Sequence, residues 1–452
     1  MSKLLLSLAL LMGLCLNAGA YTAYNLGDTI SVANTELHID IRDLPSHTIY
    51  GKAILNVKSK MDGLRHIPLQ LLHLNIDSVY VNDMLTIGTS YNDTLMQIPL
   101  PYAINSGDSV KVRVVYHGTP YSNKEGGFSW NDQEGMAHNL GSSVKDIPHC
   151  MGKCWFPCID DFRSRTYFDC YYRTDADRMA VGNGLLVGKD TLDDTSIVWH
   201  WRLGQPIPCY LASVAVGNYE NIHMNYRGET RNIPIDIYVT PDELEQARAC
   251  YAIIPKVMTV MERHFGEYRF DRVGFVSVNS PLGAMEHACN IAMMREPNTG
   301  FKYVSVVIHE LIHHWFGNLV TCDSEKDIWL NEGITSYVVA IVTESLYGEL
   351  QTKYYNDYLK SHRNYISKDS EDYHALYDMP LKDTYGILTY LKGGEVTGEL
   401  HKLLGDELFF KGMRQYLEDY AFRTATTEDF KRSLEKTTGK ELTKFFQKNV
   451  YE

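Results

Sequence analysis

Apolar and polar residues alternate through much of the first half of the chain. The segments Leu37–Ile41 and Val110–Val114 alternate strictly, which is the pattern of strands that bury one face. Turn-forming runs such as Asn105–Asp108 and Gly182–Gly184 separate such segments. The pattern predicts a domain of mostly antiparallel strands, with Leu211–Val216 as its last strand.

The hydrophobic period changes after about Asn225. Pro241–Phe265 has helical spacing and an acidic start that suits the helix dipole, and Pro255 predicts a kink or a break within it. Val273–Val278 predicts a short buried strand, and the chain from Phe301 onward predicts mainly helices.

These patterns predict an α+β protein of two domains. An antiparallel β-rich domain of saddle or sandwich type is expected over residues 21–222, and a mainly helical domain over residues 223–452. Hydrophobic residues make up 44% and charged residues 22%, which is ordinary for a globular protein. The net charge of −13 argues against nucleic-acid binding, because few cations are available to neutralise a phosphate backbone.

The first twenty residues have the layout of a secretory signal peptide. Lys3 gives a positive start, Leu4–Leu16 is nearly continuously apolar, and Ala18–Ala20 is a small-residue cleavage site. A membrane anchor is the alternative, and a lipid anchor through Cys15 a weaker one. No later segment has 18 consecutive apolar residues. We therefore expect an exported protein, periplasmic or extracellular, with no integral membrane segment after cleavage.

Eight of the nine cysteines remain after residue 20. An exported protein is permitted disulfides, although their pairing cannot be deduced from the sequence. A second metal site is an alternative, because a spacing of four residues separates Cys150, Cys154 and Cys158 and His149 lies beside them. No further ligand pair follows at a zinc-finger spacing. The sequence favours a disulfide plus buried thiols.

The segment His309–His313 predicts a metal site. The apolar residues around it follow helical spacing, so two histidines four residues apart share one face of a buried helix. Their imidazoles can bind one ion while Glu310 stands beside it without binding. The sequence allows a third ligand at Glu332, since the eighteen residues after His313 can form a loop and the start of a second helix.

Two histidines and a glutamate are a typical ligand set for one catalytic zinc ion, which keeps a fourth position open for water. Zinc lowers the pKa of such a water, and Glu310 is then placed to take its proton as general base. These residue types at this spacing predict hydrolysis of a carbonyl compound.

Five separated stretches resemble the aminopeptidase N family of gluzincins, which includes leukotriene-A hydrolase. His309–Asn318 and Trp329–Gly333 look like its two zinc helices. Gly283–His287 resembles its exopeptidase motif, Tyr390–Val396 the segment with its catalytic tyrosine, and Trp155–Asp160 a stretch of its β domain. The resemblance covers roughly residues 145–440 and implies a thermolysin-like catalytic domain with zinc bound by His309, His313 and Glu332.

The resemblance also implies roles for other residues. Glu286 would bind the free α-amino group of a peptide substrate. Gly283, Ala284 and Met285 would form an edge strand on which the substrate lies extended. Tyr390 would donate a hydrogen bond to the oxyanion, with Tyr385 as the substitute.

The chain departs from the family in three places. His287 stands where the family has asparagine, and an imidazolium there would oppose the substrate ammonium. The β domain should supply a glutamine or glutamate ahead of Trp155, where only Asp146 is available. The chain ends about sixty residues after Tyr390, so we expect the long C-terminal helical domain to be absent, with an open cleft or closure by an oligomeric partner.

The sequence thus predicts a zinc aminopeptidase acting on peptides with a free amino end. The alternatives are a zinc endopeptidase with an open cleft and a catalytically silent peptide-binding module. An epoxide hydrolase is a more remote alternative. The presence of Glu310 and Tyr390 argues against a silent module, because a binder needs no general base.

Overall fold

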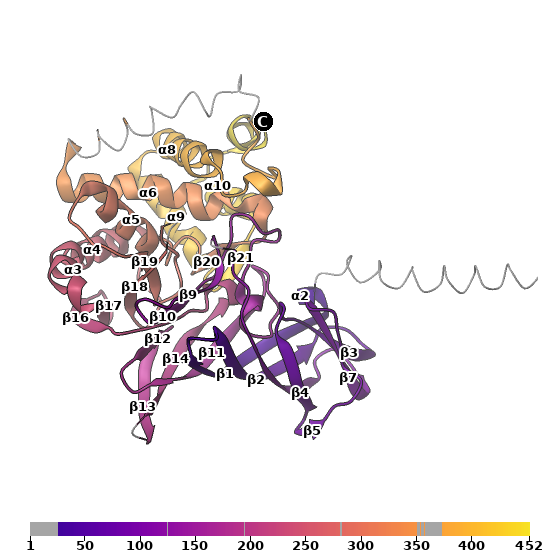
Figure 1. The fold of residues 1–452 in the computed structure, drawn as a ribbon. Helices are drawn as coiled ribbons and strands as arrows, with labels where there is room; N and C mark the ends of the chain where they lie inside the picture. The colour runs from indigo at the N-terminus through magenta and orange to yellow at the C-terminus, as the bar shows by residue number, and fades with distance from the viewer. Residues whose placement is uncertain are drawn as a thin grey trace, which may run out of the picture.

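Figure 1 shows the fold in a computed structural model of the chain. It describes residues 26–123, 125–193, 195–280, 283–349 and 373–452, together with Lys353 and Asp357. The expected signal peptide, residues 1–20, lies outside these residues. Within the described ranges, no helix is both long and apolar enough to cross a membrane.

The N-terminal half is built on one eight-stranded sheet, as its alternating pattern predicted. The pairs are antiparallel except that β1 and β11 run parallel. Along β1, Leu37, Ile39 and Ile41 are buried while the residues between them are partly exposed. In spatial order, the strands are β13 (Leu185–Asp193), β14 (Ser196–Pro208), β11 (Arg165–Asp175), β1 (Ile30–Asp43), β2 (Thr48–Ser59), β8 (Ser109–Gly118), β4 (Asn75–Val81) and β5 (Met84–Leu85).

Two smaller sheets complete this half, which opens with the short helix α2 (Leu26–Thr29). One sheet contains β3 (Leu64–Gln70), β7 (Leu95–Ile104) and β6 (Ser90–Tyr91); the other contains β12 (Met179–Gly182), β15 (Val214–Gly217), β10 (Met136–Leu140) and β9 (Gly127–Asn131). The strand predicted at Leu211–Val216 begins later, at Val214, because Cys209–Leu211 forms a 3-10 turn.

A four-stranded sheet leads into the helical half. Its order is β16 (Glu220–Arg227), β17 (Asn232–Val239), β18 (Val273–Val278) and β19 (Ile291–Met294). The buried strand predicted at residues 273–278 is confirmed. Since β16 begins at Glu220 and pairs with β17, a division at residue 222 would fall within a strand. That boundary stays a prediction.

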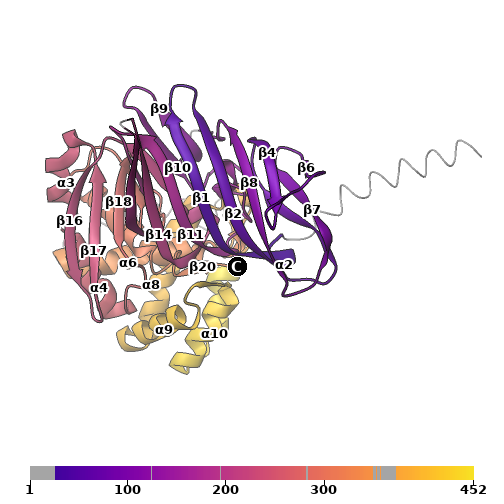
Figure 2. The ribbon, with the colours of Figure 1, turned by 90° about the horizontal axis from the view of Figure 1, so that it is seen from below.

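The helical half lies over the sheets (Figure 1), and Figure 2 shows the strands side by side beneath it. The predicted break at Pro255 is present, because one helix ends at Tyr251 and the next begins at Ile254. The elements are the 3-10 turn η4 (Pro241–Glu243), α3 (Leu244–Tyr251), α4 (Ile254–Phe265), α5 (Phe301–Ile312), β20 (Val320–Cys322), α6 (Trp329–Tyr347), the π-helical turn η8 (Leu388–Lys392), α8 (Gly393–Leu404), α9 (Asp406–Asp419), β21 (Arg423–Ala425), α10 (Thr427–Thr438) and α11 (Thr443–Phe446), with short turns η2 (Gly152–Cys154), η3 (Cys209–Leu211), η5 (Glu325–Asp327), η7 (Leu381–Asp383) and η9 (Gln447–Tyr451).

The eight cysteines are buried free thiols, so the expected disulfide is absent from the described residues. Cys150 precedes the 3-10 turn Gly152–Cys154 and Cys154 ends it, and Lys153 in this turn pairs with Asp160. Burial raises the pKa of both thiols, so they pack as small apolar side chains. The residues that the structure describes also include no metal-binding group formed by these cysteines.

Candidate active site

Three side chains converge on one point between α5 and α6. The Nε2 atoms of His309 and His313 are 3.1 Å apart. The Oε2 atom of Glu332 lies 3.4 Å from the first and 3.2 Å from the second. Ligand atoms about 2.0–2.1 Å from a tetrahedral zinc ion lie roughly 3.3 Å from one another. The triangle therefore has the size that zinc requires.

Local structure holds these groups in place. The two histidines are one helical turn apart, and Glu332 sits in the first turn of α6. The Nδ1–H of His313 donates to the carbonyl of Phe316 at 2.9 Å, which leaves Nε2 as the atom that faces the site. The Oε2 atom of Glu332 is buried and makes no well-directed hydrogen bond to a described residue. Such an orphaned oxygen fits a metal ligand.

The pKa values in the cluster are shifted because imidazole and carboxylate side chains are packed closely together. Burial disfavours the imidazolium, but the Glu332 carboxylate raises the pKa of His313 to about 10. Burial would raise the pKa of Glu332, but His313 and His309 lower it to about 2. Burial, together with nearby Glu286 and Glu332, raises the pKa of Glu310 to about 8. A carboxylate tuned toward neutrality suits an exchange of protons with substrate.

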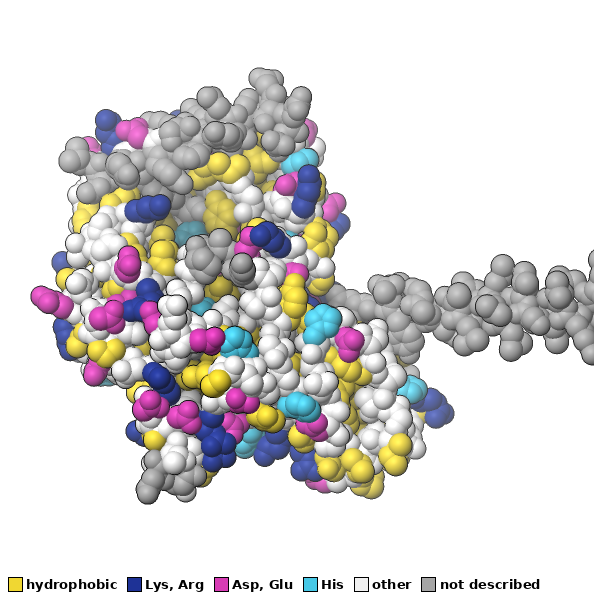
Figure 3. Space-filling view, in the orientation of Figure 1, with side chains coloured by type: hydrophobic (Ala, Val, Ile, Leu, Met, Phe, Trp, Pro, Cys, Tyr) yellow, Lys and Arg dark blue, Asp and Glu magenta, His cyan; other side chains and the backbone are white. Residues whose placement is uncertain are grey.

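Two cavities meet at this cluster. One has a volume of about 540 Å³ and the other about 470 Å³. In Figure 3, the helical half of this face is hollowed and hydrophobic side chains lie recessed in it. The residues that line both cavities are Lys302, Val306, His309, Glu310 and Tyr390. The cluster thus lies between two subsites of one cleft.

Glu286 lines the larger cavity together with Gly283, Ala284 and Met285. Its side chain is nearly buried, and burial raises its pKa. Asn318, which follows the zinc-ligand helix, donates to the Glu286 carbonyl at 2.7 Å. A direct hydrogen bond therefore joins the segment to the loop that follows the helix of His309 and His313.

The edge strand expected at residues 283–285 is reduced to a single bridge. Met285 exchanges hydrogen bonds of 2.9 and 3.0 Å with Ala292 of β19. The ladder stops there because Gly283 has a φ of 123° and the His287 N–H turns back to the Met285 carbonyl. An extended segment still lies at the edge of the sheet, but it is shorter than predicted.

Both candidate tyrosines reach the cleft. Tyr385 lines the larger cavity, and Tyr390 lines both. Burial and the nearby Glu332 carboxylate raise the pKa of Tyr390 well above its usual value, so its hydroxyl keeps a proton to donate. Gly333 in α6 and Gly393 at the start of α8 let the two helices approach closely, because a Cβ on Gly333 would lie 2.6 Å from the Gly393 Cα.

His287 does not act as the cationic residue that the sequence suggested. It is fully buried, and burial lowers its pKa to about 3. Its Nε2 accepts a hydrogen bond of 3.1 Å from the Gly141 N–H. The imidazole is therefore neutral and opposes no substrate ammonium. It joins the Glu286 segment to the N-terminal half.

The N-terminal half supplies a carboxylate that the sequence did not single out. Asp146 accepts hydrogen bonds from Tyr121 and Asn123 and does not line the cleft. Glu125 lines the larger cavity instead, paired with Lys145. Glu125 lies thirty residues before Trp155, so spacing gave no signal for it.

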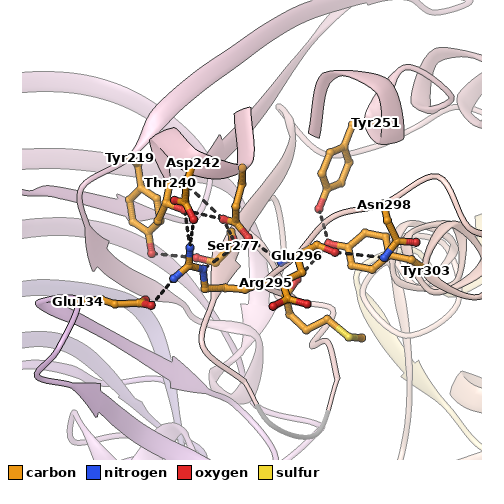
Figure 4. Close-up of polar contacts among 12 residues, drawn as sticks. Glu134, Tyr219, Thr240, Asp242, Tyr251, Ser277, Arg295, Glu296, Asn298 and Tyr303 are labelled. Carbon is orange, nitrogen blue, oxygen red and sulfur yellow. Dashed lines mark hydrogen bonds and ion pairs between the residues drawn. The ribbon is translucent and has the colours of Figure 1, made fainter. Parts of the chain in front are cut away.

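Figure 4 shows an ion-pair cluster around Arg295, directly after β19, the strand whose Ala292 bridges Met285. Arg295 pairs with Glu134 from the turn between β9 and β10 and with Asp242 at 2.7 Å. Glu243, nearly buried, accepts hydrogen bonds from Ser277 and from the Glu296 N–H, both at 2.7 Å. These contacts fasten β18 and β19 to each other and to the N-terminal half.

Comparisons with known proteins agree with this geometry. Residues 251–449 match the family model described as Peptidase family M1 domain. The chain is 26% identical over 420 residues to leukotriene A-4 hydrolase of Xenopus laevis, covering 88% of this chain and 66% of that protein. It is 27% identical over 312 residues to human endoplasmic reticulum aminopeptidase 2, covering 65% of this chain and 32% of that protein. The chain thus spans less than two thirds of the length of each of these relatives.

A solved structure shares the whole fold. A mutant form of the M1 zinc metallopeptidase from Deinococcus radiodurans superposes with a TM-score of 0.84 at 20% identity, covering 94% of this chain and 97% of that one. Its likeness confirms the arrangement of a β-rich domain followed by a helical one. Residues 251–449 are thus similar to a peptidase family M1 domain, and the ligand triangle within them could hold one zinc ion.

Proposed function

We propose that the protein is a zinc aminopeptidase that removes residues from the free amino ends of peptides. The observation that carries the proposal is one cavity that contains both the His309, His313 and Glu332 triangle and the Glu286 carboxylate. A carboxylate held near the metal cluster binds an ammonium only at one distance from the scissile bond, and this distance restricts cleavage to the first peptide bond.

The chain's own residues supply the remaining chemistry. A zinc ion held by His309, His313 and Glu332 would supply Lewis acidity, which would lower the pKa of a bound water and polarise the scissile carbonyl. Glu310, beside the ligands, accepts the proton from the attacking water and returns it to the leaving amine. Tyr390 donates its hydroxyl to the oxygen on which negative charge develops. Glu286 holds the substrate ammonium throughout.

The substrate class follows from the cleft. The mutant Deinococcus enzyme has also been solved with a Tyr-Ser-Ala substrate, and that structure superposes on this chain with a TM-score of 0.82 at 19% identity. Here the wall of the second cavity includes the apolar residues Phe301, Val339 and Leu391. We therefore propose short peptides with a free amino end as substrates.

The test compares an amino-acid anilide with its N-acetyl form, with and without a chelator. An aminopeptidase cleaves only the free form and loses that activity to the chelator. Equal cleavage of both forms would favour the endopeptidase alternative. Intact zinc binding with no hydrolysis of either would favour a silent binding module.

Export is a separate part of the proposal and rests on the pattern of residues 1–20. We propose removal of this segment after Ala20 and a periplasmic or extracellular location. The mature amino end, read by mass spectrometry of protein from the native cell, should begin at Tyr21. An amino end at Met1 on protein recovered from the cytoplasm would contradict export.

A further inference from the structure

A cationic cavity lies where the N-terminal sheets meet the segment after α9. It has a volume of about 270 Å³ and shares no lining residue with the active-site cleft. Its lining contains no carboxylate. The charged residues that line it are Lys60, Arg163, Arg165 and Arg423, and the hydroxyl-bearing ones are Ser31, Thr35, Ser164, Thr166 and Thr424. In a chain of net charge −13, this is a pronounced local excess of positive charge.

Arg165 is the least neutralised of these cations. Its terminal nitrogens donate to the Thr321 hydroxyl at 2.6 Å and to four backbone carbonyls at 3.0–3.5 Å, those of Pro206, Asn318, Leu319 and Arg423. All of these acceptors are neutral. Its Nε is buried without a hydrogen-bond partner among the described residues. Burial lowers the pKa of Arg165 to about 10, and no carboxylate offsets it. A desolvated cation of this kind is stabilised by a counter-anion.

The other cations are only partly balanced. Lys60 donates to the carbonyl of Gly27 at 2.5 Å. Arg163 lies 3.6 Å from Asp28, and both side chains are substantially exposed. It also lines a neighbouring cavity together with Asp160, Asp161, Asp323 and Glu325. Asp161 lies behind the same loop, where it accepts a hydrogen bond from the Ser164 N–H at 2.6 Å. Neither Asp28 nor Asp161 lines the cationic cavity.

We propose that this cavity binds a small oxyanion of the phosphate class. The donors come from separate elements: Lys60 just after β2, Arg163 from the loop before β11, and Arg165 from the start of β11. Guanidinium groups and an ammonium that line one cavity can give charge-assisted hydrogen bonds to the oxygens of one anion, and the donor that Arg165 has without a partner is its Nε. The volume admits free phosphate, and it also leaves room for a small organic group on that phosphate.

The cavity's position links the anion to folding. Arg165 lies in the N-terminal half, but its acceptor Asn318 follows the zinc helix, and Phe422–Thr424 belong to the C-terminal segment. An anion bound here contacts residues from both halves of the chain. Because a ligand that binds only the folded state stabilises it, phosphate should raise the unfolding temperature.

The experiment is calorimetric titration of the full zinc-loaded chain with inorganic phosphate at constant ionic strength. We expect one saturable site per chain. Lys60→Met and Arg163→Gln should each weaken binding about tenfold, the effect of losing one charge-assisted hydrogen bond. Lys52→Met, on the strand β2 that precedes Lys60 but outside the cavity, is the matched control and should leave the affinity unchanged. Arg165 itself is not replaced, since its hydrogen bonds join the two halves.

Three results would overturn the proposal. One is the absence of saturable phosphate binding. A second is unchanged affinity in both cavity variants, which would place the anion elsewhere, for example at the zinc site. A third is tighter binding of acetate than of phosphate in the same titration, which would exclude the phosphate class. A phosphate-dependent rise in the unfolding temperature that is lost in Lys60→Met but kept in Lys52→Met supports the same site independently.

Discussion

The metal cluster and the wall of the cleft are specified in different ways. The cluster depends on two helices, and its three ligands lie within 24 residues of one another along the chain. The wall combines Glu286 and its neighbours with Glu125, Leu140, Ser142 and Val144 from the N-terminal half. Helical spacing fixes the cluster, whereas the wall depends on how two halves of the chain dock. The residues for the chemistry are therefore positioned by segments close together in the sequence, whereas the residues for selectivity are positioned by segments far apart in the sequence.

The largest effect is expected inside the cluster. Glu310→Gln removes the general base but keeps the shape, so kcat should fall at least about a hundredfold. Zinc content, measured by atomic absorption, should stay at the wild-type level because Glu310 is not a ligand. Wild-type turnover in this variant would remove Glu310 from the mechanism.

Substitutions of the two tyrosines distinguish a residue that acts beside the metal cluster from one that only lines the cleft. Tyr390→Phe should lower kcat about a hundredfold with little change in KM, as loss of an oxyanion donor does. Tyr385→Phe is the matched control, and a smaller loss is expected because Tyr385 reaches only the larger cavity. Steady-state kinetics on one anilide substrate decides between them. A larger effect at Tyr385 would reverse the assignment.

Glu286 tests the wall nearest the metal. Glu286→Gln should lower kcat/KM for free-amine substrates by about ten- to a hundredfold, since a hydrogen bond to a charged group is lost. The ratio of activity on free and N-acetyl substrates should fall with it. If the variant discriminates as well as wild type, Glu286 does not bind the ammonium.

Glu125 tests the part of the wall that comes from the N-terminal half. It is paired with the exposed Lys145, so its removal should have a modest effect. Glu125→Gln should change KM by less than about tenfold, and the change should depend on the first residue of the substrate. A uniform change across a panel of aminoacyl anilides would argue against a role in selectivity.

The smallest expected effect concerns stability at the junction. The folded-state pKa of His287, about 3, lies below its unfolded value of about 6.5. Acid therefore protonates the unfolded chain first, and the stability that neutral His287 allows above about pH 6.5 is lost as the pH falls toward 3. Between pH 7.5 and 5.5 this loss is about 1.4 kcal/mol. In the His287→Asn variant, the free energy of unfolding in urea should fall by about 1.4 kcal/mol less between pH 7.5 and 5.5 than it does in the wild type. The same fall in both proteins would mean that the pKa of His287 is not shifted by folding.

Sequence reasoning found what depends on local periodicity. His309 and His313 follow from helical spacing, and the strand at residues 273–278 follows from its apolar run. It failed where distant segments decide the outcome. The burial of His287 requires the docking of Gly141. The place of Glu125 in the cleft requires the N-terminal half to lie across the cavity from α5.

The central claim is that His309, His313 and Glu332 hold one zinc ion that is required for hydrolysis of the first peptide bond. The most direct measurement is the zinc content of the purified chain and of its Glu332→Ala variant, determined together with activity on a free-amine anilide. The account predicts one zinc ion per wild-type chain, and loss of both metal and activity in the variant. Equal zinc content in the two proteins, or an active wild-type chain without stoichiometric metal, would contradict it.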